Sequence, residues 1–115
     1  FKQVNDRHGH DAGDAVLTAI ADLLRLHTRQ GDLCARLGGD EFVVAVPAPD
    51  VDARRIGGAV AQRIVTDVAA LGQGLGCSIG MVVGQPLDDP AALLERADQA
   101  MYQAKREGKN RIVSA

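Results

Sequence analysis

The stretch Leu33–Val46, LCARLGGDEFVVAV, holds two short apolar runs joined by Gly38-Gly39-Asp40-Glu41. Apolar runs separated by a short glycine-containing link are typical of a β-hairpin. The predicted turn therefore carries two adjacent carboxylates where the backbone can pass close to a ligand. Carboxylates together with substrate phosphates suit Mg²⁺. The alternative is a solvated turn, because carboxylates in loops are usually exposed.

The chain has 115 residues, which is enough for one domain with a single core, and 46% of them are hydrophobic. We expect residues 1–115 to form one domain. The net charge of −2 argues against a nucleic-acid binder or a membrane-surface protein. Without a signal peptide or a long apolar span, the sequence favours a cytoplasmic domain that makes no membrane contact. Cys34 and Cys77 suggest buried free thiols, although a disulfide remains possible.

The spacing of apolar residues predicts three helices, and the shorter apolar runs predict four strands. Asp88-Asp89-Pro90 is a strong start for the last helix, with an acidic cap and proline in the first turn. The predicted order is a helix over Asp11–Thr28, strands Leu33–Leu37 and Phe42–Val46, a helix around Ile56–Val68, a strand Cys77–Val83, a helix from Asp88 to Gly108, and a strand Arg111–Val113. This order indicates an α+β fold with a mainly antiparallel sheet flanked by helices.

Several polar side chains have the chemistry of a nucleotide site. Asn5 and Asp14 carry donor and acceptor groups that can recognise the edge of a guanine. Alternatively, Asn5 makes a turn and Asp14 caps the first helix. Lys105 and Lys109 stand at the end of the last helix, where cations suit the helix dipole and can reach a phosphate. Their alternative is a solvated basic helix end.

Three ordered motifs together resemble one known family. They are Phe1-Lys2-x-x-Asn5-Asp6-x-x-Gly9-His10-x-x-Gly13-Asp14, Arg36-x-Gly38-Gly39-Asp40-Glu41-Phe42, and Ala97–Lys105 followed by Gly108-Lys109-Asn110. The set resembles the GGDEF family of diguanylate cyclases and covers almost the whole chain. The resemblance implies that two GTP molecules condense into cyclic di-GMP and pyrophosphate with Mg²⁺ or Mn²⁺. Each domain would hold one GTP, so turnover would need a second GGDEF domain in a homodimer.

The resemblance also implies a role for each matching residue. Asp40 would bind the metal and act as the catalytic base, with Glu41 as its acidic neighbour and Lys2 as a phosphate-contacting catalytic residue. The substrate-binding positions would be Asn5 and Asp14 for guanine, His10, Gly38 and Gly39 in the substrate-contacting loops, and Lys105 and Lys109 for the triphosphate.

Arg29-x-x-Asp32 stands where the family has an inhibitory product site. Arginine can bind a phosphate through two N–H groups, and aspartate can accept hydrogen bonds from guanine. The alternative is an exposed i, i+3 charge pair, which contributes little to stability. A further arginine would complete such a site, and the candidates, which the sequence does not rank, are Arg54, Arg55 and Arg63.

The family's first metal-binding aspartate belongs upstream of Phe1, at the end of a strand preceded by a helix. We therefore expect a partial domain that lacks the first strand and helix and is inactive by itself. Binding of guanine nucleotide or cyclic di-GMP would survive. Two alternatives remain: a non-catalytic cyclic di-GMP sensor, and a polymerase-palm or nucleotidyl-cyclase relative that uses ATP.

Overall fold

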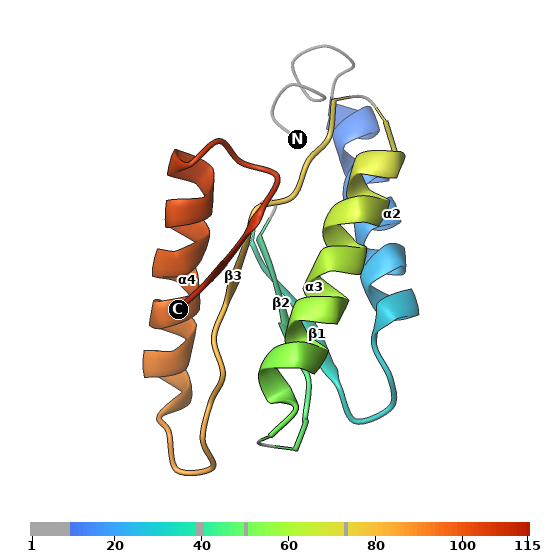
Figure 1. Cartoon of the computed structure of the whole chain (residues 1–115). Helices are drawn as coiled ribbons and strands as arrows, with labels where there is room; N and C mark the ends of the chain where they lie inside the picture. Colours follow the sequence, from blue (N-terminus) through green and yellow to red (C-terminus); the bar gives the residue numbers. More distant parts are fainter. Residues whose placement is uncertain (1–9, 39–40, 50, 73) are drawn as a thin grey trace.

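The computed structural model describes residues 10–38, 41–49, 51–72 and 74–115. Figure 1 shows helices and strands mixed along the chain, which confirms the expected α+β class. Within the described ranges, no helix has the length and apolar character needed to cross a bilayer. The elements are α2 His10–His27, β1 Leu33–Gly38, β2 Glu41–Ala45, α3 Ala53–Ala70, β3 Ile79–Met81, α4 Pro90–Arg106 and β4 Ile112–Ser114.

The predicted hairpin is formed by β1 and β2, which pair antiparallel. Cys34 lies opposite Val44, and Gly38 lies opposite Glu41 at the turn. The register shifts between Arg36 and Gly38, as in a β-bulge. The hairpin thus ends with Gly38 and Glu41 on either side of Gly39 and Asp40, which lie outside the described residues.

The other two strands form a separate, parallel pair. β3 lies beside β4, with Ile79 opposite Ile112 and Met81 opposite Ser114. The described strands are therefore divided between one antiparallel and one parallel pair, and not gathered in one mainly antiparallel sheet. The physical reason is that α4 connects β3 to β4, and a helical crossover returns the chain in the same direction. The strand expected over Cys77–Val83 is shortened to the residues that pair with β4.

The helices lie on both sides of the strands. Figure 1 shows α2 and α3 together on one side and α4 on the other. The core is a cluster formed by Leu23 and Leu24 of α2 with Ile64 and Val68 of α3. Strand residues pack against this cluster from the hairpin and from β3: Cys34, Phe42, Val44 and Ile79. The core thus joins the two pairs of strands.

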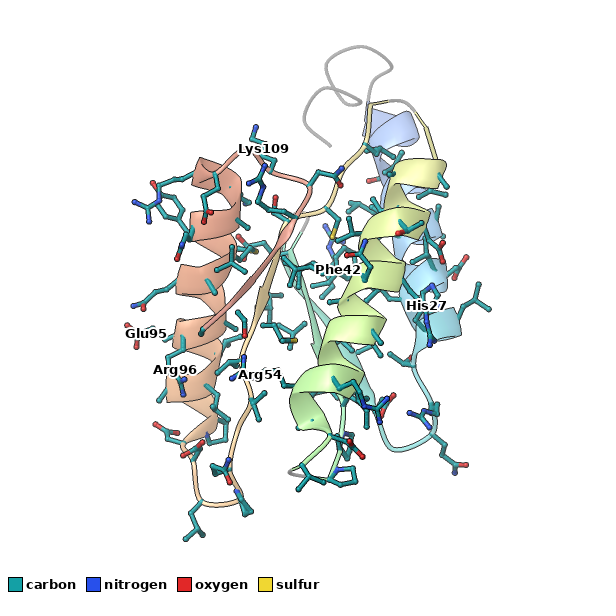
Figure 2. The ribbon with its side chains drawn as sticks, in the orientation of Figure 1. His27, Phe42, Arg54, Glu95, Arg96 and Lys109 are labelled. Atoms are coloured by element: carbon teal, nitrogen blue, oxygen red, sulfur yellow. The ribbon has the colours of Figure 1, made fainter. Side chains whose placement is uncertain are left out.

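One polar contact adds to the apolar packing of α2 on α3. His27, the last residue of α2, makes a hydrogen bond through Nε2 to Asp67 Oδ2 at 2.6 Å. The contact is partly buried, because the His27 side chain is only 16% exposed. It links the last residue of α2, labelled in Figure 2, to Asp67 near the C-terminal end of α3.

Helix α4 begins as the sequence predicts and approaches β3 very closely. Asp89 Oδ1 accepts a hydrogen bond from the Ala91 N–H at 3.3 Å, and Pro90 is the first helical residue. The helix buries Ala100 and Ala104, two of the smallest side chains. A Cβ atom on Gly80 of β3 would lie 1.9 Å from the carbonyl oxygen of Ala97. The backbone of β3 therefore packs directly on the backbone of α4 at Gly80.

Both cysteines are free thiols, so the disulfide alternative is wrong. Cys77 stands just before β3 and packs against the core cluster. Its burial raises the pKa of the thiol above the ordinary value, because the charged thiolate is disfavoured away from water.

Gly80→Ala is expected to destabilise the protein by roughly 1–3 kcal/mol, because the added methyl group meets backbone atoms that cannot rotate away. Urea unfolding measures the change in the free energy of unfolding. Gly58→Ala in α3 is the matched control, because a Cβ there meets nothing within 4 Å. Equal stability of the two variants would contradict the close contact at Gly80.

The raised pKa of Cys77 predicts a loss of stability at alkaline pH. Below the unfolded-state pKa of about 8.5, the thiol is protonated in both states and contributes no pH dependence. Above it, the unfolded chain ionises first, so the free energy of unfolding falls as pH rises toward the folded pKa. Cys77→Ala removes this decline. The prediction fails if wild type and variant differ by the same free energy of unfolding at pH 7 and at pH 10.

Candidate functional site

The structure describes part of the predicted GTP site. Lys2, Asn5, Gly39 and Asp40 lie outside the described residues. His10 is the first residue of α2, and only its place in the helix is described. The described members of the predicted site are Asp14, Gly38, Glu41, Lys105 and Lys109.

Two of these residues line one open hollow of about 770 Å³ between the start of β2, helix α4 and the end of β4. We call it the α4–β4 hollow. Glu41 enters it from the first position of β2, directly after the predicted metal-binding turn. Lys105 enters it from the last turn of α4. The fold therefore brings a carboxylate and an ammonium group, 64 residues apart in sequence, to one surface.

The α4–β4 hollow also contains polar groups that the sequence analysis did not single out. Arg96, Tyr102 and Arg106 line it, and the Arg106 guanidinium lies 5.2 Å from the centre of the Tyr102 ring. Tyr102 and Arg106 are four residues apart and so share a face of α4. The i, i+4 spacing of Tyr102 and Arg106, beside Lys105, is the sequence signal that could have placed these two residues at the site. The hollow therefore holds the cations of Arg96, Lys105 and Arg106 beside the carboxylates of Glu41 and Asp98, whereas Lys109 does not line it.

Lys109 lies in the turn that follows α4 (Figure 2). Its backbone N–H donates to the Ala104 carbonyl oxygen at 3.0 Å, which ties the turn to the helix end. Lys105 and Lys109 are both exposed. In the described part of the chain, no carboxylate lies within ion-pair distance of either ammonium group. Both cations are therefore open to an anionic ligand, and a solvated basic helix end remains the alternative.

Asp14 does not cap the first helix, so the alternative of a helix cap is wrong. The helix begins at His10, and Asp14 is its fifth residue. A cap must precede or begin the helix to reach the unpaired N–H groups of the first turn. The Asp14 side chain is instead exposed, while its carbonyl oxygen accepts a hydrogen bond from Thr18 Oγ1 at 3.0 Å. The guanine-binding role stays a prediction, and Asp14 does not line the α4–β4 hollow.

Arg29 and Asp32 form a closed turn between α2 and β1. The Arg29 N–H donates to Asp32 Oδ2 at 2.8 Å, and the Asp32 N–H donates to the Arg29 carbonyl oxygen at 3.0 Å. Among the described residues, no ion pair joins the two side chains, so the charge-pair alternative is wrong. The carboxylate holds the turn, while Arg29 is exposed. The inhibitory role stays a prediction.

Two of the three further candidate arginines have other partners. Arg54 Nη1 donates to Ser114 Oγ at 2.5 Å, and Arg55 pairs with Asp52 at 3.3 Å. Arg63 is exposed on α3. The contact of Arg54 links the first turn of α3 to the last residue of β4.

A metal site cannot be assembled from the described residues alone. They contain no group of three or more His, Cys, Asp or Glu side chains suited to hold an ion. Glu41 supplies one carboxylate beside the position of Asp40. Hard carboxylate oxygens match Mg²⁺ or Mn²⁺ when phosphate oxygens complete the coordination.

Comparison with known proteins shows the family. Residues 1–111 match the family model "Diguanylate cyclase, GGDEF domain". The chain is 43% identical over 119 residues to diguanylate cyclase DgcP of Pseudomonas aeruginosa, covering 97% of the chain and 17% of DgcP. The chain thus spans less than a fifth of the length of that relative.

Solved structures give the same result. Diguanylate cyclase SiaD of Pseudomonas aeruginosa, in complex with its activator SiaC, superposes with a TM-score of 0.83 at 36% identity, covering 99% of this chain and 45% of SiaD. The coiled coil and GGDEF domain of DgcB from Caulobacter crescentus, in complex with c-di-GMP, superposes with a TM-score of 0.79 at 27% identity. The match covers 99% of this chain and 63% of the DgcB chain. Motifs, fold and comparisons agree that the chain belongs to the GGDEF domain family of diguanylate cyclases.

Proposed function

We propose that the protein containing this chain condenses two GTP molecules into cyclic di-GMP and pyrophosphate. The observation that carries the proposal is the α4–β4 hollow, which Glu41 and Lys105 both line. A triphosphate needs cations that contact its oxygens and carboxylates that bind its metal ion. Because GTP is an intracellular nucleotide, the proposed place of action is the cytoplasm.

The proposed roles divide between the two ends of the nucleotide. Asn5 and Asp14 bind the guanine edge, which an adenine cannot match because its hydrogen-bonding groups differ. Lys105 and Lys109 contact the triphosphate, as the two exposed cations at the end of α4. Lys2 contacts the phosphate at which the reaction takes place, and His10, Gly38 and Glu41 border the substrate.

The proposed chemistry is an in-line displacement. Asp40 accepts the proton of a 3′-hydroxyl, whose oxygen forms a bond to the α-phosphorus of the second GTP while the bond to pyrophosphate breaks. Asp40 would hold a divalent ion, which would neutralise charge on the triphosphate. Two such transfers close the ring, so two domains must face each other about a two-fold axis, each with one GTP.

We also propose that cyclic di-GMP binds at Arg29 and Asp32 and inhibits turnover. The closed turn supports this, because it holds Asp32 in place while the exposed guanidinium of Arg29 can reach a phosphate or a guanine. The same turn supports the second candidate function, a non-catalytic cyclic di-GMP sensor. The two candidates differ in whether product is made. If this chain is tested alone, we propose that it binds nucleotide without turnover.

Asp40→Asn is expected to lower the rate of cyclic di-GMP synthesis by the full-length protein by about 10²–10⁴-fold, because the amide cannot accept the 3′-hydroxyl proton. Product formation from GTP with Mg²⁺ or Mn²⁺ is followed by chromatography. Glu95→Gln is the matched control, because Glu95 is an exposed carboxylate of α4 outside the α4–β4 hollow. It should leave the rate within about twofold. If the wild-type protein makes no product but binds cyclic di-GMP, the sensor function replaces the cyclase.

Arg29→Ala is expected to weaken cyclic di-GMP binding by about tenfold or more, the value of one hydrogen bond to a charged group. Isothermal titration calorimetry measures the dissociation constant. The matched control is Arg25→Ala, since Arg25 is an exposed arginine of the same helix end paired with Asp22 at 3.1 Å. If Arg29→Ala leaves the affinity for cyclic di-GMP unchanged, the product binds at a site other than the Arg29–Asp32 turn.

A further inference from the structure

The turn between α4 and β4 has an unusual backbone. Gly108, Lys109 and Asn110 follow one another with φ values of 123°, 64° and 49°. Among the described residues, Lys109 and Asn110 are the only non-glycine residues with positive φ. L-residues with a Cβ atom are disfavoured there, and asparagine is among the best tolerated. Something must therefore hold Lys109 in this conformation.

Both backbone polar groups of Lys109 are hydrogen-bonded. Its N–H donates to the Ala104 carbonyl oxygen at 3.0 Å, and its carbonyl oxygen accepts from Arg111 Nε at 3.2 Å. The next backbone contact continues into the sheet, where the Ile79 N–H donates to the Arg111 carbonyl oxygen at 2.9 Å. Lys109 is thus fixed between the end of α4 and the start of the β3–β4 pairing.

Asn110 closes the turn against the chain that leads into β3. Its Oδ1 accepts a long hydrogen bond of 3.4 Å from the Cys77 N–H. The same side chain fills the space beside Gly76, since a Cβ atom added there would lie 3.3 Å from Asn110 Cβ and 3.4 Å from Oδ1. The side chain therefore lies directly on the 76–77 backbone, which has no side chain at Gly76 to push it away.

We propose that Asn110 is a positioning residue for Lys109. It accepts the left-handed conformation that ends the turn and locks the turn to the 76–77 backbone. The Lys109 ammonium is then presented on a fixed backbone, next in the chain to the helix end that carries Lys105. A long side chain on a fixed backbone loses less conformational entropy when it binds an anion. This inference rests on the proposed function, in which Lys109 contacts the triphosphate of GTP.

The test is a double-mutant cycle in the full-length protein. The probe is a GTP analogue with a methylene bridge between the α- and β-phosphorus atoms, which binds but cannot release pyrophosphate. Its dissociation constant is measured with Mg²⁺ for wild type, Asn110→Ala, Lys109→Ala and the double variant. We expect each single variant to weaken binding by about tenfold. The double variant should bind no more weakly than Lys109→Ala, because Asn110 acts through Lys109.

A merely structural role of Asn110 predicts a different result. The effect of Asn110→Ala would then multiply with that of Lys109→Ala and give about a hundredfold loss of affinity in the double variant. This result would overturn the positioning role of Asn110 and leave the proposed function standing. If Lys109→Ala leaves binding unchanged, the proposed contact of Lys109 with the triphosphate falls as well. The two failures are therefore distinguishable.

Two further variants keep the test decisive if Asn110→Ala folds poorly. Gly76→Ala leaves the turn sequence intact and intrudes on the Asn110 side chain, so it should weaken analogue binding several-fold, with no further loss in the Lys109→Ala background. Gly58→Ala is its control, because a Cβ there meets nothing within 4 Å. Asn110→Asp keeps the oxygen acceptor and should restore most of the affinity. Wild-type affinity in Gly76→Ala, or no rescue by Asn110→Asp, would overturn the inference.

Discussion

The C-terminal half of the molecule depends on the approach of α4 to β3, where Gly80 brings the strand backbone against the helix backbone. Small buried residues, Ala100 and Ala104, continue this contact along the helix. The chain has only residues 107–111 between α4 and β4 in which to reverse and pair β4 beside β3. Such a short reversal favours left-handed residues, as at many helix C-termini. The positive φ of Lys109 thus belongs to a short reversal that is closed by hydrogen bonds to Ala104 and Arg111.

The two regions that we propose bind nucleotide lie at opposite ends of one strand. Glu41 faces the last residue of β1, and Asp32 immediately precedes its first residue. A six-residue strand at about 3.3 Å per residue separates them by roughly 20 Å. Cys34 of that strand packs on the core cluster of α2 and α3, as does Phe42 of its partner. The Arg29–Asp32 turn therefore leads directly into the hairpin that carries Gly38 and Glu41 at its other end.

Much of the fold could be predicted because the signals are local. The hairpin follows from two apolar runs and their glycine link, and α4 begins at Asp89-Pro90 as capping chemistry requires. The corrections have two origins. One is local: Asp14 was offered as a cap, but the helix begins at His10, one turn earlier, in a polar segment without apolar periodicity. The others concern contacts between distant parts. The sheet was expected to be mainly antiparallel, but helical periodicity alone does not show that α4 is a crossover. The His27–Asp67 contact joins residues 40 apart and left no local signal.

By itself, the sequence determined the α+β class, the family, and the residue types available for a GTP site, because these depend on short-range periodicity and on motif spacing. Only the tertiary structure decided that Glu41 and Lys105 share the α4–β4 hollow, together with Arg96, Tyr102 and Arg106. It also decided that Asp32 bonds to the backbone of its own turn instead of pairing with the guanidinium of Arg29. For the hollow, the physical reason is that its lining comes from three elements whose distances are set by packing, which no local pattern of residues encodes. For Arg29 and Asp32, the same i, i+3 spacing allows either a side-chain ion pair or a bond to the backbone, so the spacing alone does not decide between them.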